Sequence, residues 1–537
     1  MSLTQRRYAA ALGVGLNPTE DRPNRARKAA SGNIAALRGK RVCASVNFWI
    51  AVGLIVAAFL IRLPNFGNPA YELDEEFYLL VGDRMLHGML PYIDIWDRKP
   101  IGLFLLYAAI RLLGGDGILQ YQIIAALFAG GTACLIHRTA RPLAGQFGAV
   151  VAALAYLLWV ETVEGGGGQA PIFYNLFVAG TAACTLAVFV APRGDGAKLR
   201  KFAFAAMAFG GIAIQLKYTA VFEVAYFGAL LAWRTLRDNK RLVAALETAA
   251  LALTALVPTI CAAGFYAIIG QFHSFWFANF QSVFHRSAMY PDELHRALVE
   301  MAKHVAPFAA CYVASLLQLR ASGDAEMRQR HMIVSGWVGA ALAGYFSVGA
   351  LFYHYMLPLF VPLSIAAAPI FRRWPIGAVM GAILLWFPLS NLNYPDFATT
   401  RYARERIAAM ERLIPRDVDR SCMQMFAGPP ILYLRTNACF VSRYVFPDHL
   451  VSRVETNAIG VASSAELRRI FARRPGAIVT NDNDYRLDPA SFAVLKALRS
   501  RFYHHVGSVE LDGRKIDIWV INTDQAHRPN IVGTRSS

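Results

Sequence analysis

The sequence predicts a multi-spanning α-helical membrane protein that carries a soluble α/β domain at its C-terminus. Hydrophobic residues make up 56% of the 537 residues and charged residues only 17%, below the roughly 25% typical of soluble domains. The charges are clumped, and long apolar runs lie between the clumps. From about Tyr394 the composition becomes mixed, with short strand-like and helix-like runs, so a different kind of fold begins there.

About eleven apolar runs are candidates for spans, since a transmembrane helix needs about 20 apolar residues. A polar and basic tail over residues 1–45 precedes the first run, and we expect it to be disordered and cytoplasmic, with the first run as an uncleaved signal anchor. The runs predict a membrane domain over residues 46–394. They comprise 46–63, 118–136, 146–160, 172–191, 202–216, 219–234, 244–269, 304–318, 332–350, 355–371 and 375–392.

The loops between these runs favour one orientation under the positive-inside rule. Alternate loops are basic and read HRTARPLAG, PRGDGAKLRK, RTLRDNKR, RASGDAEMRQRH and FRRWP. The opposite loops are acid-rich or mixed and comprise residues 64–117, 161–169, 270–303 and the turn near Phe352. The tail and the basic loops are therefore expected inside, and the acidic loops and the C-terminal domain outside.

The formal charge of +18 could indicate nucleic acid or anionic lipid as a partner. The basic residues lie in short loops between apolar runs, which is the pattern that membrane orientation produces, so we expect membrane lipids and no nucleic acid as partners. The sequence also has no P-loop, no C-x-x-C zinc motif and no G-x-S-x-G motif. Nucleotide binding by a P-loop, a zinc site of this type and a serine nucleophile are therefore not expected.

The first outer loop, residues 64–117, is the most informative segment. Residues 74–88 are expected to form an amphipathic helix on the membrane surface, ended by Gly88. Its apolar stripe comprises Tyr78, Val81, Met85 and Leu86. The apolar run 101–113 is too short to cross comfortably and suits an interfacial or re-entrant helix. Counting it as a span would place every later basic loop outside.

Several short motifs of this loop occur together. They are Asp74-Glu75-Glu76-Phe77-Tyr78 at the start of the helix, G-x-x-P-Y from Gly88 to Tyr92, and K-P-x-G from Lys99 to Gly102. The stretches Phe352–Leu359, Pro430–Leu434 and Ser442–Pro447 add to the pattern. Over residues 65–450 the chain resembles the polyprenyl-phosphate-sugar-dependent glycosyltransferases of the GT-C type. Within that group it is similar to protein O-mannosyltransferases and lipid A aminoarabinose transferases.

The resemblance implies that an acceptor hydroxyl attacks the anomeric carbon of a sugar carried on a lipid phosphate. Such a reaction needs a carboxylate to take the hydroxyl proton and cations to hold the departing phosphate. Asp74 matches the family's first-loop catalytic acid, with Glu75 as its neighbour. Lys99 matches the lysine that contacts the donor phosphate, and Arg98 is adjacent to it without a secure match. A direct displacement would invert the anomeric centre.

These residues also have structural explanations. The helix macrodipole favours acidic residues at a helix N-terminus, and a lysine at a membrane interface often extends to the headgroups. The whole loop favours catalysis for Asp74 and phosphate binding for Lys99, whereas Glu72 and Glu76 are expected on a solvated face. Two aromatic residues of the same motifs are expected to line the substrate pocket, Tyr78 and Tyr92.

A second acidic site is expected after the third span, where ETVEGGGGQAPIFYN offers Glu161 and Glu164. Relatives carry an acid directly before an Ile-Phe pair, but this chain has Pro171 there. The identity of the second acid is therefore left open. The run Gly165–Gly168 is either a flexible gate or an ordinary loop, and the sequence does not distinguish these.

Three further residues at the outer ends of spans are candidates for the donor pocket. Lys217 could reach the phosphate, and an unpaired charge at membrane depth is costly enough to favour a function over a turn residue. His354 and Tyr355 could line the donor pocket, or they could be interfacial packing residues. Clustered carboxylates could also hold a divalent metal, and because the loop has no recognisable ligand set, metal involvement stays open.

The C-terminal domain, residues 395–537, is expected to be α/β or α+β. Strand-like runs are GAIVTND and KIDIWVIN, and helix-like runs are SSAELRRIFARR and SFAVLKALRS. Cys422 and Cys439 both fall in this domain. An oxidising compartment would permit a disulfide between them, and we expect that pairing.

Taken together, the sequence favours a glycosyltransferase of the bacterial inner membrane with a cytoplasmic N-terminus and a periplasmic C-terminal domain. Its partners would be a polyprenyl-phosphate-linked sugar donor and a glycan, lipid or protein acceptor. A transporter or flippase of lipid-linked sugars is the first alternative. Transporters usually show internal repeats and midplane charges, neither of which is visible here. A non-catalytic envelope scaffold is the second alternative.

Overall fold

The computed structural model describes residues 45–190, 196–347, 349–483 and 486–522. The expected basic tail, residues 1–45, lies outside the described residues except for Ser45. By its contacts the chain divides into two units, Met1–Gly53 and Leu54–Ser537. The described residues of the first unit are helical, and every contact given below lies within the second unit.

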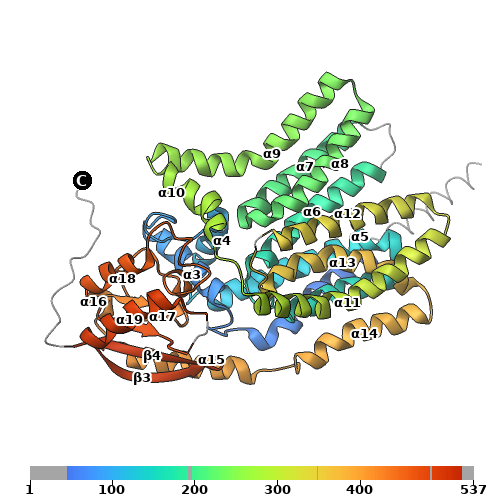
Figure 1. Ribbon diagram of the computed structural model, residues 1–537. Coiled ribbons are helices and arrows are strands. Elements are labelled where there is room, and N and C mark those ends of the chain that lie inside the picture. Colours follow the sequence, from blue (N-terminus) through green and yellow to red (C-terminus); the bar gives the residue numbers. More distant parts are fainter. Residues whose placement is uncertain (1–44, 191–195, 348, 484–485, 523–537) are drawn as a thin grey trace, which may run out of the picture. The chain divides into compact units, whose positions relative to one another are not determined.

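Each candidate span of the sequence corresponds to a helix (Figure 1). Six stretches in the described ranges are long and apolar enough to cross a membrane: Ser45–Asn65, α5 (Ile118–Glu161), α6 (Ala170–Val190), α7 (Gly196–Leu216), α9 (Arg241–Ile268) and Tyr353–Arg372. The other candidates fall in α8 (Val221–Asp238), α11 (Pro291–Ala321), α12 (Ala325–Phe346) and α14 (Ile376–Asn391). The count of about eleven spans stays a prediction.

Helix α5 contains two of the candidate spans in one element of 44 residues. This length suffices for two crossings, since one crossing takes about 20 residues. Pro142 lies inside the element, and Gly145 leaves the helical conformation with φ of 70°. Proline removes a helical hydrogen bond, and glycine adopts positive φ at low cost. The break therefore coincides with the basic loop HRTARPLAG that the sequence places between the two spans.

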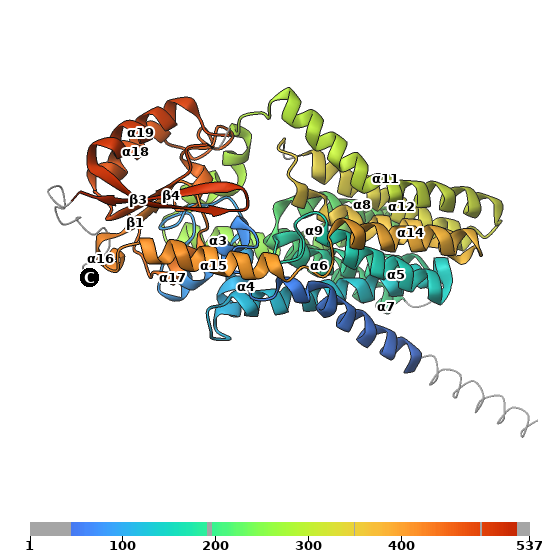
Figure 2. The same ribbon diagram turned by 90° about the horizontal axis from the view of Figure 1, so that it is seen from below.

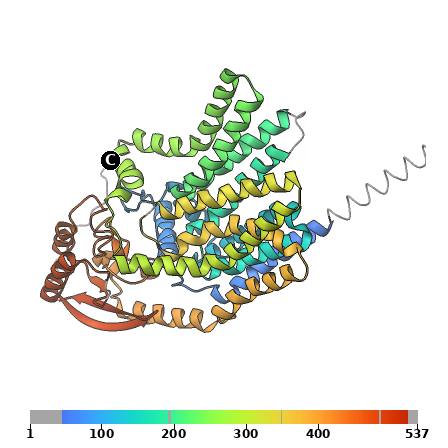
Figure 3. The same ribbon diagram turned by 45° about the vertical axis from the view of Figure 1, so that its right-hand side comes forward.

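Short elements connect the long helices. The stretch Tyr353–Arg372 is built from η5 (Tyr353–Leu359), α13 (Phe360–Ala367) and η6 (Ala368–Arg372). Between α9 and α11 lie α10 (Phe272–Trp276), the π-helical η3 (Phe277–Gln281) and η4 (Ser282–His285), and η2 (Tyr218–Ala220) follows α7. Helix α13 packs against α5, α11 and α12 (Figure 3), so it is buried from end to end.

The first loop forms η1 (Leu63–Asn65), α3 (Leu73–Leu86) and α4 (Ile101–Arg111). The expectation of an amphipathic first helix is wrong, because every residue from Glu75 to Asp83 is buried. Its place relative to a membrane surface stays a prediction. Helix α4 packs on one side so closely that a Cβ on Gly82 would lie 2.6 Å from the Ala108 nitrogen. The C-terminal region packs on the other side through α17 (Ile431–Arg435). An amphipathic stripe therefore does not describe α3.

The C-terminal region, residues 395–537, is built on a four-stranded sheet with the order β1-β2-β4-β3. Strands β1 and β2 are parallel, and β4 is antiparallel to β2 and β3. Helices α18 and α19 lie on one side of the sheet and α15 on the other (Figure 2). The bounds are α15 (Ala398–Leu413), α16 (Val418–Ser421), β1 (Met423–Met425), η7 (Pro447–His449), α18 (Ser463–Ala472), β2 (Ala477–Thr480), α19 (Pro489–Phe502), β3 (Tyr503–Leu511) and β4 (Arg514–Ile521).

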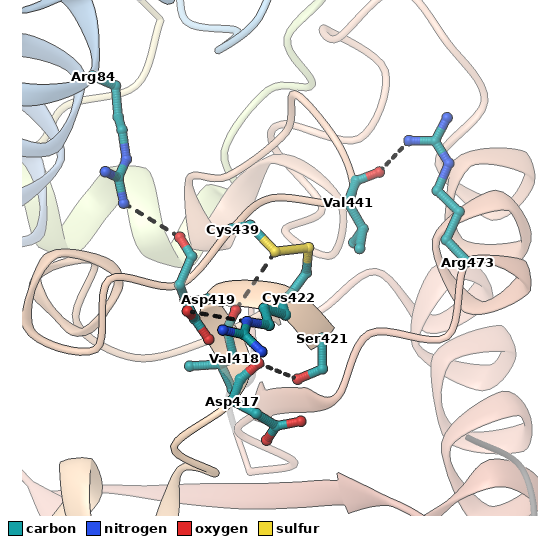
Figure 4. Close-up of a disulfide and its surroundings, with 11 residues drawn as sticks. Arg84, Asp417, Val418, Asp419, Ser421, Cys422, Cys439, Val441 and Arg473 are labelled. Carbon is teal, nitrogen blue, oxygen red and sulfur yellow. Dashed lines mark hydrogen bonds and ion pairs between the residues drawn. A yellow bond between two sulfur atoms is a disulfide. The ribbon is translucent and has the colours of Figure 1, made fainter. Parts of the chain in front are cut away.

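Both strand-like runs and both helix-like runs of the sequence are present in this region, as β2, β4, α18 and α19. Strands β1 and β3 lack a clear sequence signal. The sulfur atoms of Cys422 and Cys439 are bonded to each other (Figure 4). The disulfide lies where β1 begins, and beside it the Met423 nitrogen donates to the Cys439 carbonyl at 3.1 Å.

Trp96 of the first loop is a core residue of the C-terminal region. Its ring centroid lies 4.7 Å from that of His449 and 5.7 Å from that of Tyr444, and its backbone nitrogen donates to the Arg443 carbonyl at 2.9 Å. The C-terminal region thereby fixes the start of the segment that contains Arg98. The first loop and the C-terminal region belong to the same packing unit.

Candidate active site

A cavity of about 1280 Å³ lies between the first loop, the ends of the long helices and the C-terminal region. The first loop contributes residues 70–74, Glu76 and residues 97–100. The segment 276–288, Ser347, the segment 349–355 and the turn after α7 form further parts of the wall. The C-terminal region closes it with the segments that follow β1 and β2 and with the turn between β3 and β4. Segments that are far apart in the sequence therefore meet around one space.

Asp74 lies in the first turn of α3 and lines this cavity. Its carboxylate oxygen is 3.6 Å from the Lys99 ammonium and 3.8 Å from His354 Nε2. Burial by itself would raise the pKa of Asp74, but the positive charge of Lys99, together with His354 and Lys217, lowers it to about 2. Asp74 is therefore a carboxylate over the whole physiological pH range.

Lys99 is held from several sides. Asp97 accepts a hydrogen bond from the Lys99 backbone nitrogen at 2.9 Å, and the Tyr92 hydroxyl donates to the Lys99 carbonyl at 2.7 Å. The Lys99 ammonium lies 5.2 Å from the centre of the Tyr78 ring, within cation–π range. Tyr78 and Tyr92 are fully buried and do not line the cavity. Contrary to the expectation, they support the lysine from behind the wall.

Lys217 lines the same cavity just beyond the end of α7. Its ammonium lies 4.1 Å from the centre of the Tyr355 ring. It makes no ion pair in the described part of the chain. Burial, together with the positive charge of Lys99, lowers the pKa of Lys217 to about 7. The site thus contains a lysine that gains a proton when a negative charge arrives beside it.

Arg286 and Glu455 complete the cavity wall, and the sequence analysis missed both. The Glu455 carboxylate lies 2.6 Å from the guanidinium of Arg98 and 2.6 Å from that of Arg286. Burial would raise the pKa of Glu455, but the two arginines lower it to about 2. Arg98 also donates to the Ser282 hydroxyl at 3.1 Å. Arg98, Arg286 and Glu455 come from three separate segments of the chain, so no local sequence motif identifies them as a group.

Glu75 faces away from the cavity although it follows Asp74 directly. It is fully buried and lies against Gly167, where any Cβ would overlap its carboxylate oxygens. Burial raises the pKa of Glu75 to about 8, and neither of its carboxylate oxygens has a hydrogen-bond partner among the described residues. Glu76 is also buried and accepts a hydrogen bond from the Ile431 nitrogen at 3.0 Å. The expectation of a solvated Glu76 is therefore wrong.

The two candidates for the second acid have different surroundings. Glu161 is buried behind the cavity wall, where it pairs with Arg62 at 3.3 Å and accepts a hydrogen bond from Asn65 at 3.2 Å. Glu164 lines the cavity, and its carboxylate lies 2.9 Å from His354 Nδ1. Only Glu164 is therefore connected to Asp74, through the imidazole of His354.

The glycine run after Glu164 is packed rather than open. Arg62 donates to the carbonyl of Gly165 at 2.5 Å and to that of Gly167 at 3.0 Å. The Tyr71 hydroxyl accepts a hydrogen bond from the Gly166 nitrogen at 3.0 Å. Side chains of the first loop come so close that a Cβ would have no room at either Gly166 or Gly167. Glycine is needed here for close packing, and the run holds Glu164 in place.

His354 is fixed by aromatic neighbours. Its ring is nearly parallel to that of Phe352, with centroids 5.9 Å apart, and perpendicular to that of Tyr355 at 4.7 Å. Across residues 45–522, within the described ranges, no group of three or more His, Cys, Asp or Glu side chains has the geometry to hold a metal ion. The candidate site consists of carboxylates, cations and an imidazole.

No protein-family model matches the sequence, and no curated protein matches it. Solved structures do match. ArnT from Cupriavidus metallidurans bound to undecaprenyl phosphate has 14% identity and a TM-score of 0.57, over 90% of this chain and 99% of that chain. The same protein in the apo state has 15% identity and a TM-score of 0.58, over 89% of this chain and 98% of that chain.

An oligosaccharyltransferase from Archaeoglobus fulgidus, tethered to an acceptor peptide, also matches. It has 11% identity and a TM-score of 0.50, over 86% of this chain and 72% of that chain. ArnT is a lipid A aminoarabinose transferase, and both proteins are glycosyltransferases of the GT-C class. At these identities the likeness concerns the fold, and it extends over most of the chain. The chain therefore has the fold of the GT-C membrane glycosyltransferases.

Proposed function

We propose that this protein is an integral membrane glycosyltransferase that moves a sugar from a polyprenyl-phosphate donor to a glycan, lipid or protein acceptor. The observation that carries the proposal is Asp74, a cavity carboxylate 3.6 Å from Lys99 and 3.8 Å from His354. The similar ArnT was solved with undecaprenyl phosphate and the similar oligosaccharyltransferase with an acceptor peptide. A cavity that combines cations with a carboxylate suits both kinds of ligand.

The donor phosphate would be held by Lys99, Lys217 and Arg286. Negative charge builds on the phosphate as its bond to the anomeric carbon breaks, and cations already in position stabilise that charge. Lys217 makes no ion pair among the described residues, so an incoming phosphate replaces no carboxylate there. The phosphate also favours the protonated form of Lys217, which is needed to hold it.

Asp74 would take the proton from the acceptor hydroxyl. In the free enzyme Lys99 holds the pKa of Asp74 at about 2, which makes it a weak base. A bound phosphate neutralises Lys99 and adds a negative charge nearby, and both effects raise the pKa of Asp74. The acceptor hydroxyl becomes acidic as its oxygen bonds to the anomeric carbon. Attack opposite the leaving phosphate inverts that carbon.

His354 and Glu164 would then carry the proton away from Asp74. The imidazole stands between the two carboxylates, 3.8 Å from Asp74 and 2.9 Å from Glu164. An imidazole can accept a proton at one nitrogen while it releases one from the other. Glu164 is the second acid in this scheme. Glu161 instead neutralises Arg62, which anchors the glycine run.

The reaction would take place on the periplasmic face of a bacterial inner membrane. The basic loops of the chain support this orientation, because they alternate with the loops that supply Asp74, Glu164 and His354. The cavity wall contains parts of these acid-rich or mixed loops, residues of the helices α7, α8 and α9, and segments of the C-terminal region. A periplasmic C-terminal region also agrees with the disulfide Cys422–Cys439, since that compartment is oxidising.

The test is a comparison of envelope glycolipids, polysaccharides and proteins by mass spectrometry in a deletion strain complemented with single variants. The wild-type gene should restore a missing sugar, and Asp74→Asn should not, although it should still bind undecaprenyl phosphate. Asp94→Asn is the matched control. Asp94 lies in the same loop outside the cavity, where it accepts a hydrogen bond from the Leu90 nitrogen, and asparagine retains that acceptor.

Two outcomes would contradict the proposal. If the deletion changed no glycan, sugar transfer would not be the activity. If Asp74→Asn restored the glycan as well as the wild type does, the chain would act as a flippase of lipid-linked sugars or as an envelope scaffold. Neither of those alternatives needs a base in the cavity.

A further inference from the structure

Glu455 pairs with two arginines of the cavity wall, although sugar transfer as described above gives it no task. Its carboxylate lies 2.6 Å from Arg98 and 2.6 Å from Arg286. It comes from the C-terminal region, whereas the arginines come from the first loop and from the segment before α11. All three residues line the cavity that contains Lys99. The Glu455 carboxylate therefore reaches the wall beside Lys99, because its partner Arg98 directly precedes that lysine in the chain.

Glu455 is held firmly at this position. The Ser287 nitrogen donates to the Val454 carbonyl at 3.2 Å, and Arg453 pairs with Glu293 at 3.3 Å. The Glu455 nitrogen itself donates to the Ser452 carbonyl at 3.0 Å. These contacts join the C-terminal region to α11 and to the segment before it. The carboxylate is thus a built part of the wall.

Seven charged residues of the wall are linked to one another by ion pairs or by their effects on each other's pKa, and further charged residues, among them Glu164 and Arg514, also line the cavity. We use the term anion site for seven cavity residues, which are Arg98, Lys99, Lys217, Arg286, Asp74, Asp97 and Glu455. With Lys217 protonated, four cations face three carboxylates, so one positive charge is in excess. The nearby His449 adds none, because burial and Arg98 lower its pKa to about 3. Without Glu455 the excess would be two positive charges.

We propose that Glu455 restricts the anion site to donors that carry their sugar on a single phosphate group. This inference deepens the proposed function and rests on it. A polyprenyl-phosphate sugar is a phosphodiester with one negative charge, which matches one excess positive charge. A diphosphate-linked donor carries about one more negative charge and would face the Glu455 carboxylate. Glu455 is a specificity residue that acts on the lipid carrier, and Asp74 keeps its separate role as the base.

The test measures binding of undecaprenyl phosphate and undecaprenyl diphosphate to the full-length protein in detergent. Both are monoesters without a sugar, and they differ by about one negative charge, as the two kinds of donor do. The wild type should bind the monophosphate more tightly. Glu455→Gln removes one negative charge from the wall, so it should strengthen binding of the diphosphate relative to the monophosphate. The ratio of the two dissociation constants should change about tenfold or more in that direction. Glu455→Asp keeps the charge and should keep the ratio. Glu300→Gln is the matched control and should also keep the ratio, because it removes a carboxylate of α11 that pairs with Lys303 outside the cavity.

The results have distinct meanings. An unchanged ratio in Glu455→Gln, or a shift toward the monophosphate, would overturn the role of Glu455. A wild-type protein that prefers the diphosphate would overturn it without any variant, so the proposal can be tested even if Glu455→Gln does not fold. If the wild type binds neither lipid, the proposed function fails instead.

Discussion

Asp74 and Glu75 are neighbours in the chain, but they belong to two different regions of the molecule. Asp74 faces the cavity, where Lys99 and His354 offset its burial and its pKa falls to about 2. Glu75 faces the packed glycine run, where burial is not offset by a comparable cation and its pKa rises to about 8. At neutral pH one residue is a carboxylate and the other a neutral acid. The comparison shows that two acids of one motif need not share a task.

The largest expected difference between the two is catalytic. Asp74→Asn should lower the rate of sugar transfer by about 10²–10⁴, the usual contribution of a general base. Glu75→Gln should change it less than tenfold, because a glutamine amide resembles the neutral acid that already occupies the site. Transfer to the acceptor should be measured under saturating donor. A loss for Glu75→Gln as large as that for Asp74→Asn would place both acids in the reaction.

The second difference concerns stability and pH. The folded-state pKa of Glu75, about 8, lies above its ordinary value of 4.5, so its stabilising effect is complete below pH 4.5 and is lost as the pH rises toward 8. The loss amounts to about 5 kcal/mol once the pH has passed 8. Glu75→Gln should remove this part of the pH dependence. The unfolding temperature, measured in detergent from pH 5 to 9, should therefore fall less steeply with pH for the variant than for the wild type.

The glycine run gives a steric test of the same region. Gly167→Ala places a methyl group where the Glu75 carboxylate lies, and overpacking of this kind costs about 1–3 kcal/mol. Gly339→Ala in α12 is the control, because nothing lies within 4 Å of a Cβ there and alanine is the better helix former. Unfolding temperatures should fall for the first variant and hold or rise for the second. If the two variants had the same unfolding temperature, the glycine run would accommodate a methyl group without cost, as expected of a flexible gate.

The smallest expected effect concerns the cavity that Asp74 faces, and it is the pH dependence of phosphate binding by Lys217. Lys217 has a pKa of about 7 in the free protein, and a bound anion raises it, so affinity for a lipid phosphodiester should be full below pH 7 and fall as the pH rises above it. Lys217→Met should bind about tenfold more weakly at pH 6 and lose this dependence. Binding titrations at several pH values measure both. A wild-type affinity that rises with pH would contradict this assignment.

Much of this arrangement could be predicted from the sequence. The helices at the candidate spans and the disulfide follow from hydropathy and cysteine position, and the motif around Asp74 and Lys99 marked two residues that do meet. The pairing of Glu164 with His354 could not be predicted, because 190 positions separate them. The burial of α3 was missed for a related reason. Its outward face is covered by α17, which follows more than three hundred positions later.

The sequence by itself determined that the chain has long apolar helices, a mixed C-terminal region and a loop that combines acids with a lysine. Local composition is enough for these, because hydropathy and motif spacing act over short distances along the chain. Only the tertiary structure decided which acid faces the cavity, and that Glu455 stands between Arg98 and Arg286. Charge and pKa depend on which groups lie within a few ångströms of each other, and folding brings those groups together from distant parts of the chain.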